Sequence, residues 1–270
     1  MELKPFIRWA GGKQSLIKRI KEYAPSPDKV NTYYEPFLGA GSLFFCTEYK
    51  HSVLSDINPD LINCYKQIKK KYEDVSKYLE EYKAKHSKVF YYEIREEYNQ
   101  NQGENTIEQA ARFIYLVQSS FNGIYRVNQN GEYNVPYGKD NPSIPTKEYL
   151  KKISKKLKSA IIKCSAYKKA LGKVNEGDFV YLDPPYPPLS ETSVFQHYTK
   201  DRFPPSKQEE LATTIDKLRD NNAYILISNA ETDLIKNLYS SWTVKKISVR
   251  RYVMSTGDTK TVSELLIQNY

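Results

Sequence analysis

The stretch VYLDPPYPP, residues 180–188, combines a strand with an abrupt stop. Its β-branched and aromatic start is typical of a buried parallel strand. Pro184 and Pro185 have no amide hydrogen to donate to a strand ladder, so the strand must end at Asp183. Because ligands of open α/β sheets bind at the carboxyl ends of the strands, Asp183 and Tyr186 are candidate site residues. An ordinary exit from a strand into a loop would give the same pattern.

Two strand–loop–helix units lie upstream of this stretch. Residues 31–45, NTYYEPFLGAGSLFF, predict a strand, a glycine loop and the start of a helix. Residues 51–70, HSVLSDINPDLINCYKQIKK, predict a strand that ends at Asp56 and a helix that begins near Pro59. Repeated units of this kind are typical of a parallel α/β sheet.

The alternation continues after the DPPY stretch. The pattern predicts a helix over 206–220, a strand over 223–228 and a helix over 231–239. Two last strands, 243–252 and 263–268, flank a glycine-containing turn and predict a closing antiparallel hairpin. The expected fold is therefore α/β, a mostly parallel sheet with a terminal antiparallel hairpin.

The sequence between the two halves of this sheet is helical in character. It runs from 61 to 121, is rich in charges and tyrosines, and has a polar break, NQNQGEN, at 99–105. Thr106 is placed to cap the helix that follows, in which Ala110, Phe113, Ile114 and Val117 have core spacing.

The loop over 122–145 is rich in Asn, Gly and Pro, and its Asn-Gly pairs favour a tight hairpin. So long a loop in a compact domain is typically functional or disordered. We therefore divide the chain into an α/β domain, residues 1–59 and 146–270, and a helical insert, residues 60–145.

Composition sets further limits. The chain has 270 residues and a formal net charge of +9, which favours a polyanionic partner, although a basic surface can also serve solubility alone. No apolar run reaches the roughly 18 residues that a membrane span needs. The N-terminal residues lack an apolar signal core, so we expect a cytoplasmic protein. The three cysteines are isolated, so neither a zinc site nor a disulfide framework is expected, and we predict no metal.

Three motifs predict a ligand site near the first strands. RWAGGK at 8–13 has the Gly-Gly-Lys of a phosphate loop but not its spacing, so a triphosphate is not expected. EPFLGAGSLFF at 35–45 has two glycines that let a backbone approach a bound molecule, and the carboxylate of Glu35 suits a positively charged cofactor. Asp56 follows about 20 residues later, where it can accept hydrogen bonds from ribose, or simply cap a helix. Their order and spacing favour a nucleoside cofactor.

Five motifs occur in a fixed order: FIRWAGGK at 6–13, YEPFLGAGS at 34–42, LSDIN at 54–58, NGIYRVNQNGEYNVPYG at 122–138 and YLDPPYPPLS at 181–190. Together they closely resemble the Dam-type DNA adenine N6-methyltransferases of the alpha group. The resemblance runs from Phe6 nearly to the C-terminus and includes ISNAETD and RRYVMSTGDTKTVSELL. It implies a Rossmann-like, S-adenosylmethionine-dependent methyltransferase sheet with an inserted target-recognition domain.

The resemblance also implies a reaction and its partners. The methyl donor would be S-adenosylmethionine, and the substrate would be adenine in double-stranded DNA, within a GATC-type target. The amino group of that adenine lies inside a duplex, so the base must be flipped out. We further expect a monomer without a membrane partner, and a cognate restriction endonuclease is a candidate partner.

Matched motif by motif, the resemblance assigns catalysis to Asp183, Pro184, Pro185 and Tyr186. It assigns cofactor binding to three groups: Trp9, Ala10, Gly11, Gly12 and Lys13; Glu35, Pro36, Phe37, Gly39, Gly41 and Ser42; and Asp56, Ile57 and Asp183. The segment 164–167 also aligns with a stretch that contacts the cofactor. It assigns DNA recognition to Arg8, Phe121, Asn122, Arg126, Asn134 and Pro136. Two residues depart from the family: Phe121, where tyrosine is common, and Asp140, where an aromatic can meet the DNA.

The chemistry of adenine agrees with these assignments. The amino nitrogen is a poor nucleophile because its lone pair is delocalised into the ring. Asp183 can accept one of its hydrogens and the rigidly held carbonyl of Pro184 the other, while Tyr186 stacks on the base. Catalysis would then consist of positioning and of stabilising the positive charge that grows on nitrogen. For Arg126, the guanidinium fork suits the two major-groove acceptors of guanine.

Two other functions stay open at this point. A methyltransferase that acts on RNA or on a protein glutamine could use the same clamp, since both offer a planar amino group. The glutamine type more often has Asn in place of Asp183. A DNA-binding homologue without catalytic activity is the second alternative, against which the intact DPPY motif argues.

Overall fold

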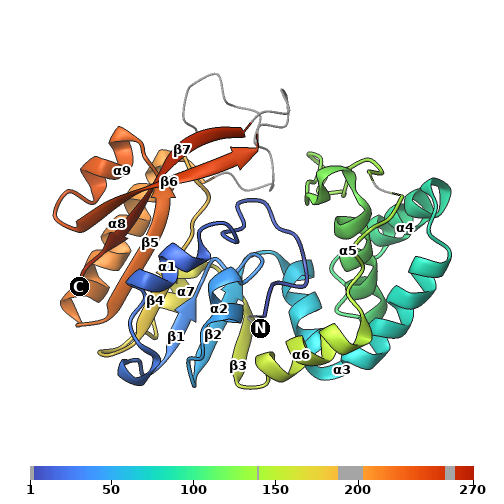
Figure 1. The fold of residues 1–270 in the computed structure, drawn as a ribbon, viewed down its shortest axis with the longest axis horizontal. Coiled ribbons are helices and arrows are strands. Elements are labelled where there is room, and N and C mark those ends of the chain that lie inside the picture. Colours follow the sequence, from blue (N-terminus) through green and yellow to red (C-terminus); the bar gives the residue numbers. More distant parts are fainter. Residues whose placement is uncertain (1–2, 139, 188–202, 253–258) are drawn as a thin grey trace.

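The computed structural model describes residues 3–138, 140–187, 203–252 and 259–270. Seven strands form one sheet in the order β3-β2-β1-β4-β5-β7-β6 (Figure 1). The first five are parallel, and β7 pairs antiparallel with both β5 and β6. This arrangement confirms the predicted fold class. The strands are β1 (Tyr33–Glu35), β2 (Ser52–Asp56), β3 (Ala160–Cys164), β4 (Phe179–Leu182), β5 (Tyr224–Ala230), β6 (Thr243–Tyr252) and β7 (Thr259–Gln268).

The central strand β4 is buried on both faces, as its continuous apolar run predicts. Phe179 and Tyr181 belong to one apolar cluster, and Val180 and Leu182 to a second one. Because neighbouring strand residues point to opposite faces, the two clusters lie on opposite sides of the sheet. The first is covered by α1 (Ile17–Tyr23), α2 (Ser42–Cys46) and the start of α3, the second by α7 (Tyr167–Leu171), α8 (Pro205–Asp220) and α9 (Asp233–Leu238).

The insert is a bundle of helices beside the sheet, at the right of Figure 1. It contains α3 (Pro59–Ala84), α4 (Lys88–Gln100) and α5 (Ile107–Ser119), and α6 (Lys147–Leu157) leads back to the sheet. The amide of Gln109 donates to the Thr106 hydroxyl, which caps α5 as predicted. Every residue of α5 from Gln109 onward is buried, so this helix is the core of the insert.

Helix α3 runs from the sheet into the insert, because it begins directly after β2 and packs on both α5 and α6. Its helical geometry is interrupted at Lys71, where φ is −139° and ψ is 37°. The carbonyl of Lys69 accepts a hydrogen bond from the Ser154 hydroxyl of α6 at 3.1 Å. A side chain from another helix thus provides a hydrogen bond beside the kink.

Three features differ from the prediction. Strand β3 and helix α7 were not expected; β3 is an edge strand in which only Ala160 is buried, so its apolar signal is weak. The helical stretch is broken at 85–87 as well as at the predicted polar break. Of the two Asn-Gly pairs, Asn130-Gly131 lies at a hairpin tip, while Asn122-Gly123 belongs to a short 3-10 turn, η2 (Phe121–Gly123).

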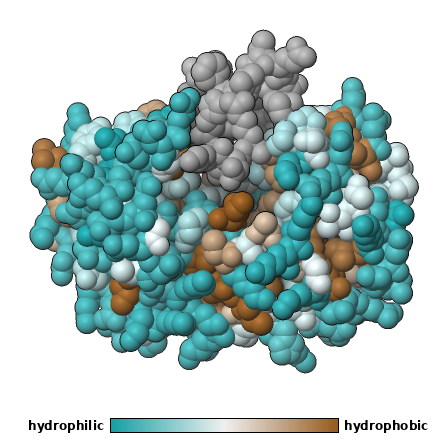
Figure 2. Space-filling model, turned by 180° about the vertical axis from the view of Figure 1, so that it is seen from behind, coloured by the Kyte–Doolittle hydropathy of each residue, from teal (hydrophilic) through white to brown (hydrophobic). Residues whose placement is uncertain are grey.

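The surface is mainly polar. Figure 2 shows the far side of the molecule, on which hydrophilic residues prevail and apolar ones gather chiefly near the middle. Within the described ranges, no helix has both the length and the apolar character that crossing a membrane requires. A second short 3-10 turn, η1 (Pro27–Lys29), precedes β1.

Candidate active site

The carboxyl ends of three neighbouring strands form the candidate site. Strands β2, β1 and β4 are adjacent and parallel, with Tyr34 opposite both Val53 and Val180. Parallel neighbours end at the same edge of a sheet, so the segments that follow these strands open on one side. Glu35 and Asp56 are the last residues of β1 and β2, and Asp183 directly follows β4, so all three residues predicted for the site lie at this edge.

Asp183 is paired with Lys13. The Lys13 ammonium lies 2.7 Å from Asp183 Oδ1, and it also donates to the carbonyl of Gly11 at 2.7 Å. The same ammonium lies 4.6 Å from the centroid of the Tyr186 ring. Only 5% of the Lys13 side chain is exposed, against 19% for Asp183. Burial raises the pKa of Asp183, and the lysine charge opposes that rise.

The other DPPY residues are held by side chains from the C-terminal third. The Tyr186 hydroxyl donates to Glu264 Oε2 at 2.8 Å, and Gln208 Nε2 donates to the Pro185 carbonyl at 2.8 Å. The Ser228 hydroxyl lies 3.4 Å from Asp183 Oδ1. Burial raises the pKa of Tyr186, so the phenol stays protonated at neutral pH.

The glycine loop is tied to Asp56. The amide of Gly39 donates to Asp56 Oδ2 at 2.9 Å, and the amide of Asn58 donates to Asp56 Oδ1 at 3.0 Å. Burial raises the pKa of Asp56, while these backbone donors lower it. Gly39 has φ of 47°, and a Cβ there would lie 2.8 Å from Trp9 Cδ1. The space at this glycine is therefore filled by the Trp9 ring.

Glu35 is a buried acid with an altered pKa. Its side chain is 3% exposed and accepts a hydrogen bond from the Tyr33 hydroxyl at 2.7 Å. Burial raises its pKa to about 8, and the negative charges of Asp183 and Asp56 contribute to the rise. Glu35 is thus largely protonated at pH 7, and a nearby positive charge would favour its ionisation.

The two aromatic residues assigned to the cofactor, Phe37 and Trp9, lie in different parts of the site. Phe37 stacks on Tyr167 with ring centroids 5.3 Å apart, next to the ring of Phe203. Tyr167 ends the 164–167 segment that the resemblance connects with the cofactor. Trp9 instead stacks on Tyr125 of the insert at 5.3 Å and 17°. Trp9 therefore connects the glycine loop with the insert.

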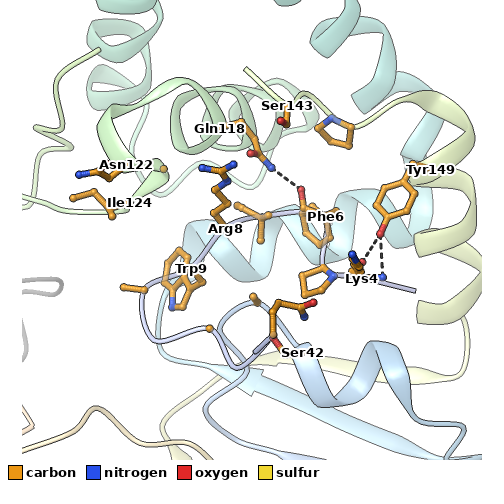
Figure 3. A pocket seen from close by; sticks show the side chains of 18 residues that line it. Lys4, Phe6, Arg8, Trp9, Ser42, Gln118, Asn122, Ile124, Ser143 and Tyr149 are labelled. Atoms are coloured by element: carbon orange, nitrogen blue, oxygen red, sulfur yellow. Dashed lines mark hydrogen bonds between the residues drawn. The ribbon is translucent and has the colours of Figure 1, made fainter. Parts of the chain in front are cut away.

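A cavity of about 540 Å³ lies between the N-terminal segment and the insert (Figure 3). Its walls bring together residues that the resemblance assigns to the cofactor and to DNA, among them Arg8, Trp9, Ala10, Gly12, Ser42 and Asn122. The remaining cofactor assignments lie beside the strand ends: Gly11, Pro36 and Gly41 in the loops, and Ile57, which is 57% exposed, next to Asp56.

The recognition loop, as we call residues 122–145, is held by its own residues and by helix α4 with the turn that follows it, from which Tyr91, Asn99 and Gln102 donate hydrogen bonds to its backbone. Arg126 Nε donates to Asn134 Oδ1 at 2.8 Å, which orients the guanidinium. The amide of Phe121 donates to the Pro136 carbonyl at 2.9 Å, and the Phe121 ring is 53% exposed. Asp140 accepts a hydrogen bond from the Tyr137 hydroxyl at 2.8 Å.

Arg8 packs against the turn at Gly123, where a Cβ would lie 2.5 Å from Arg8 Cδ. Arg8 and Asn122 both line the same cavity.

The sequence analysis did not identify Gln208, Ser228 and Glu264 as site residues. Each is at most 2% exposed and contacts the DPPY motif. A signal was present for Ser228, a polar residue that follows the apolar run at 223–227, and for Glu264, which precedes the apolar run at 265–267, whereas Gln208 stands among other polar residues. Such residues are buried only when they have partners. Within the described ranges, no cluster of three or more His, Cys, Asp or Glu residues could hold a metal ion.

Comparisons with known proteins agree with this geometry. Residues 9–255 match the family model described as D12 class N6 adenine-specific DNA methyltransferase. The chain is 38% identical over 292 residues to the Type II methyltransferase M.MjaIII of Methanocaldococcus jannaschii, with all of both chains covered. It is 36% identical over 276 residues to the Type II methyltransferase M1.LlaDCHI of Lactococcus lactis subsp. cremoris, covering 100% of this chain and 96% of that protein.

A DNA adenine methylase of Escherichia coli (strain K12) is 35% identical over 267 residues, covering 97% of this chain and 94% of that protein. The sheet and the acidic site at its carboxyl edge are those of a methyltransferase. The chain belongs to the D12 class of N6 adenine-specific DNA methyltransferases.

Proposed function

We propose that this enzyme transfers a methyl group from S-adenosylmethionine to N6 of an adenine in double-stranded DNA, within GATC, after the base has been flipped out of the helix. The observation that carries the proposal is the Lys13–Asp183–Tyr186 arrangement. The Lys13 ammonium is a nitrogen donor 2.7 Å from the Asp183 carboxylate and 4.6 Å from the Tyr186 ring centroid. An adenine amino group stacked on that ring would need the same acceptor, so Lys13 must leave Asp183 when the base enters.

The clamp has a second acceptor. The Pro185 carbonyl already accepts a hydrogen bond from Gln208 at 2.8 Å. The carbonyl of Pro184 is therefore the one that we assign to the second amino hydrogen. With Asp183 and Pro184 as acceptors, the nitrogen lone pair turns away from the ring plane and toward the methyl donor. Acceptors placed in advance stabilise the positive charge that develops on nitrogen.

We assign S-adenosylmethionine to the edge formed by the loops after β1 and β2. The acid of Glu35 suits the positive charge of this cofactor, and Asp56 suits its ribose hydroxyls. The stacked rings of Phe37 and Tyr167, 5.3 Å apart, provide a flat apolar surface for its adenine. The other residues that we assign to it are Trp9, Ala10, Gly11, Gly12, Lys13, Pro36, Gly39, Gly41, Ser42 and Ile57.

We assign the reading of the target to the insert, residues 60–145, and catalysis to residues 1–59 and 146–270. The Arg126 guanidinium, held by Asn134 at 2.8 Å, would read a guanine. Phe121, Asn122, Asn134, Pro136 and Arg8 complete the recognition surface. We further propose that the enzyme acts as a cytoplasmic monomer, with a restriction endonuclease of the same target as its candidate functional partner.

The test is transfer of a labelled methyl group from S-adenosylmethionine to duplexes that differ at one base pair. We expect transfer to a GATC duplex, and about 5- to 150-fold less to a duplex with one changed pair. Equal transfer to all duplexes would contradict the target. Transfer to RNA or to a glutamine-containing peptide, and not to DNA, would contradict the substrate.

A further inference from the structure

We propose that Glu264 of β7 is a positioning residue, which fixes the Tyr186 ring in the plane that the target base stacks on. The inference rests on the function proposed above. Nothing in the motif chemistry calls for this carboxylate, yet Glu264 is 2% exposed and its Oε2 lies 2.8 Å from the Tyr186 hydroxyl. Burying a carboxylate costs free energy unless it is hydrogen-bonded. We therefore infer that the hydrogen bond to Tyr186 is a function of Glu264 at this position.

The strand that carries Glu264 is a rigid support. β7 is paired on both edges, with Glu264 opposite Ala230 of β5 and opposite Ile247 of β6. Two residues before Ala230, on the same strand β5, Ser228 contacts Asp183. The acid and the ring of the clamp are therefore both connected to neighbouring strands of one sheet, which fixes their relative position.

Tyr186 needs such support because its backbone does not orient its ring. The two prolines before it restrict the backbone, but the ring still rotates about χ1 and χ2. A hydrogen bond at the hydroxyl fixes the far end of the ring. The Lys13 ammonium lies over the face of the ring, 4.6 Å from its centroid, so a base that stacks on this face would displace Lys13. The hydrogen bond to Glu264 orients the ring without covering the surface on which a base would stack.

The charge of Glu264 strengthens this hydrogen bond. A hydrogen bond to an ionised acceptor is shorter and stronger than one between neutral groups. Burial, together with Asp183 and Glu264, raises the pKa of Tyr186, which keeps the phenol protonated as the donor.

Three variants separate the hydrogen bond from the charge. Glu264→Gln keeps an acceptor oxygen, so we expect kcat within about 3-fold of the wild type. Glu264→Leu removes the acceptor, and we expect kcat to fall by about 10- to 100-fold. Tyr186→Phe removes the donor and should have a loss of the same size. In all three variants the affinity for S-adenosylhomocysteine should stay unchanged, because the cofactor does not contact this hydrogen bond.

The double variant Tyr186→Phe/Glu264→Leu tests whether the two residues act together. We expect its kcat to lie within about 3-fold of the slower single variant, because both changes remove one interaction. Leu265→Ala is the matched control. Leu265 belongs to the apolar cluster on the opposite face of the sheet. Its truncation should lower the unfolding temperature while kcat of the folded enzyme stays unchanged.

Three results would overturn the proposal: full kcat in Glu264→Leu, a Glu264→Gln enzyme as slow as Glu264→Leu, or additive losses in the double variant. The free energies of unfolding of the wild type, Tyr186→Phe, Glu264→Leu and the double variant form a second double-mutant cycle. If that cycle shows no coupling between the two residues, the hydrogen bond between them is refuted. The proposed function fails separately, when the wild-type enzyme does not methylate adenine in DNA. The unfolding cycle still decides the contact in that case.

Discussion

The catalytic edge and the recognition loop are built in opposite ways. At the edge, charged side chains are almost fully buried: Lys13 is 5% exposed, Glu35 3% and Glu264 2%. Their partners are distant in the sequence, as in the pair Tyr186–Glu264, which is separated by 78 positions. In the recognition loop, Phe121 is 53% exposed, and Arg126 is held by Asn134, only eight positions away.

This difference between the catalytic edge and the recognition loop indicates which parts of the chain the chemistry and the reading of the target would each depend on. The chemistry depends on the whole sheet, because residues from several strands must meet at one acid. In the function that we propose, the target is read by the hairpin around residues 126–134, which lies outside the sheet and is hydrogen-bonded to helix α4 through Asn99. Substitutions at the two regions should therefore affect different kinetic parameters.

The largest effect is expected at the edge. Asp183→Ala removes the acceptor of the amino hydrogen, and we expect kcat to fall by at least about 10³-fold. It also leaves the buried Lys13 ammonium without its carboxylate, so its unfolding free energy must be measured alongside. Asp183→Asn is the matched control, which keeps the shape and one acceptor oxygen and should lose less. Residual activity within tenfold of the wild type in Asp183→Ala would refute the assigned role.

The next largest effect is expected in the loop. Arg126→Ala removes the guanidinium fork, so discrimination at one guanine should weaken by about 10- to 100-fold. Transfer to the cognate duplex at saturating DNA should change far less, because Asp183 and its partners are untouched. The measurement is kcat/KM on the cognate duplex and on duplexes altered at each base pair. Unchanged specificity would show that Arg126 does not read a base of the target. The two regions would then not differ in the kinetic parameters that they control.

A pH effect should appear at the edge but not in the loop. The pKa of Glu35 is raised to about 8, and the positive charge of a bound cofactor should lower it. Cofactor binding then releases a proton, so affinity for S-adenosylmethionine should rise about fivefold from pH 7 to pH 8. Calorimetry in buffers of different ionisation enthalpy measures both quantities.

Glu35→Gln is the control for this prediction. It should bind the cofactor more weakly, with affinity independent of pH in this range. Glu35 holds its proton more tightly in the folded state, with a pKa of about 8 against a reference of 4.5. Its contribution to stability is therefore lost as the pH rises from 4.5 through 8. Glu35→Gln should not show that loss, and an identical pH profile of stability in both proteins would contradict the raised pKa.

The smallest effect is expected from the residue that holds Arg126. Asn134→Ala removes the hydrogen bond to Arg126 Nε, which lies 2.8 Å from Asn134 Oδ1. The fork itself remains, so discrimination at the same guanine should weaken by only about 3- to 5-fold. Glu132→Ala, at an exposed position of the same hairpin, is the control and should keep full discrimination. A larger loss in Asn134→Ala than in Arg126→Ala would mean that Asn134 itself contacts the base.

The ends of the strands could be predicted because residues close to them in the sequence determine them. Prolines stop β4 at Leu182, directly before Asp183, and Asp56 closes β2 where the prediction ended it. Thr106 caps α5 for an equally local reason. These features depend on residues within a few positions, so the sequence alone determines them.

The contacts that complete the site could not be predicted in this way, because they join residues that are far apart in the sequence. Glu264 meets Tyr186 only because β7 is inserted between β5 and β6, and strand order is not visible in a local pattern. Lys13 was assigned to the cofactor, whereas in the structure its ammonium forms an ion pair with Asp183. β3 was missed because an edge strand with one buried residue has little apolar periodicity.

The kink at Lys71 lies in the helix that joins the sheet to the part of the molecule that we propose reads the target. The part of α3 beyond Lys71, residues 72–84, acts as a lever arm about 20 Å long. A rotation of about 5° at its base moves the far end by roughly 2 Å, the range over which a hydrogen bond is made or lost. A change of angle at the kink would therefore shift the insert, which we propose reads the target, relative to the strand edge.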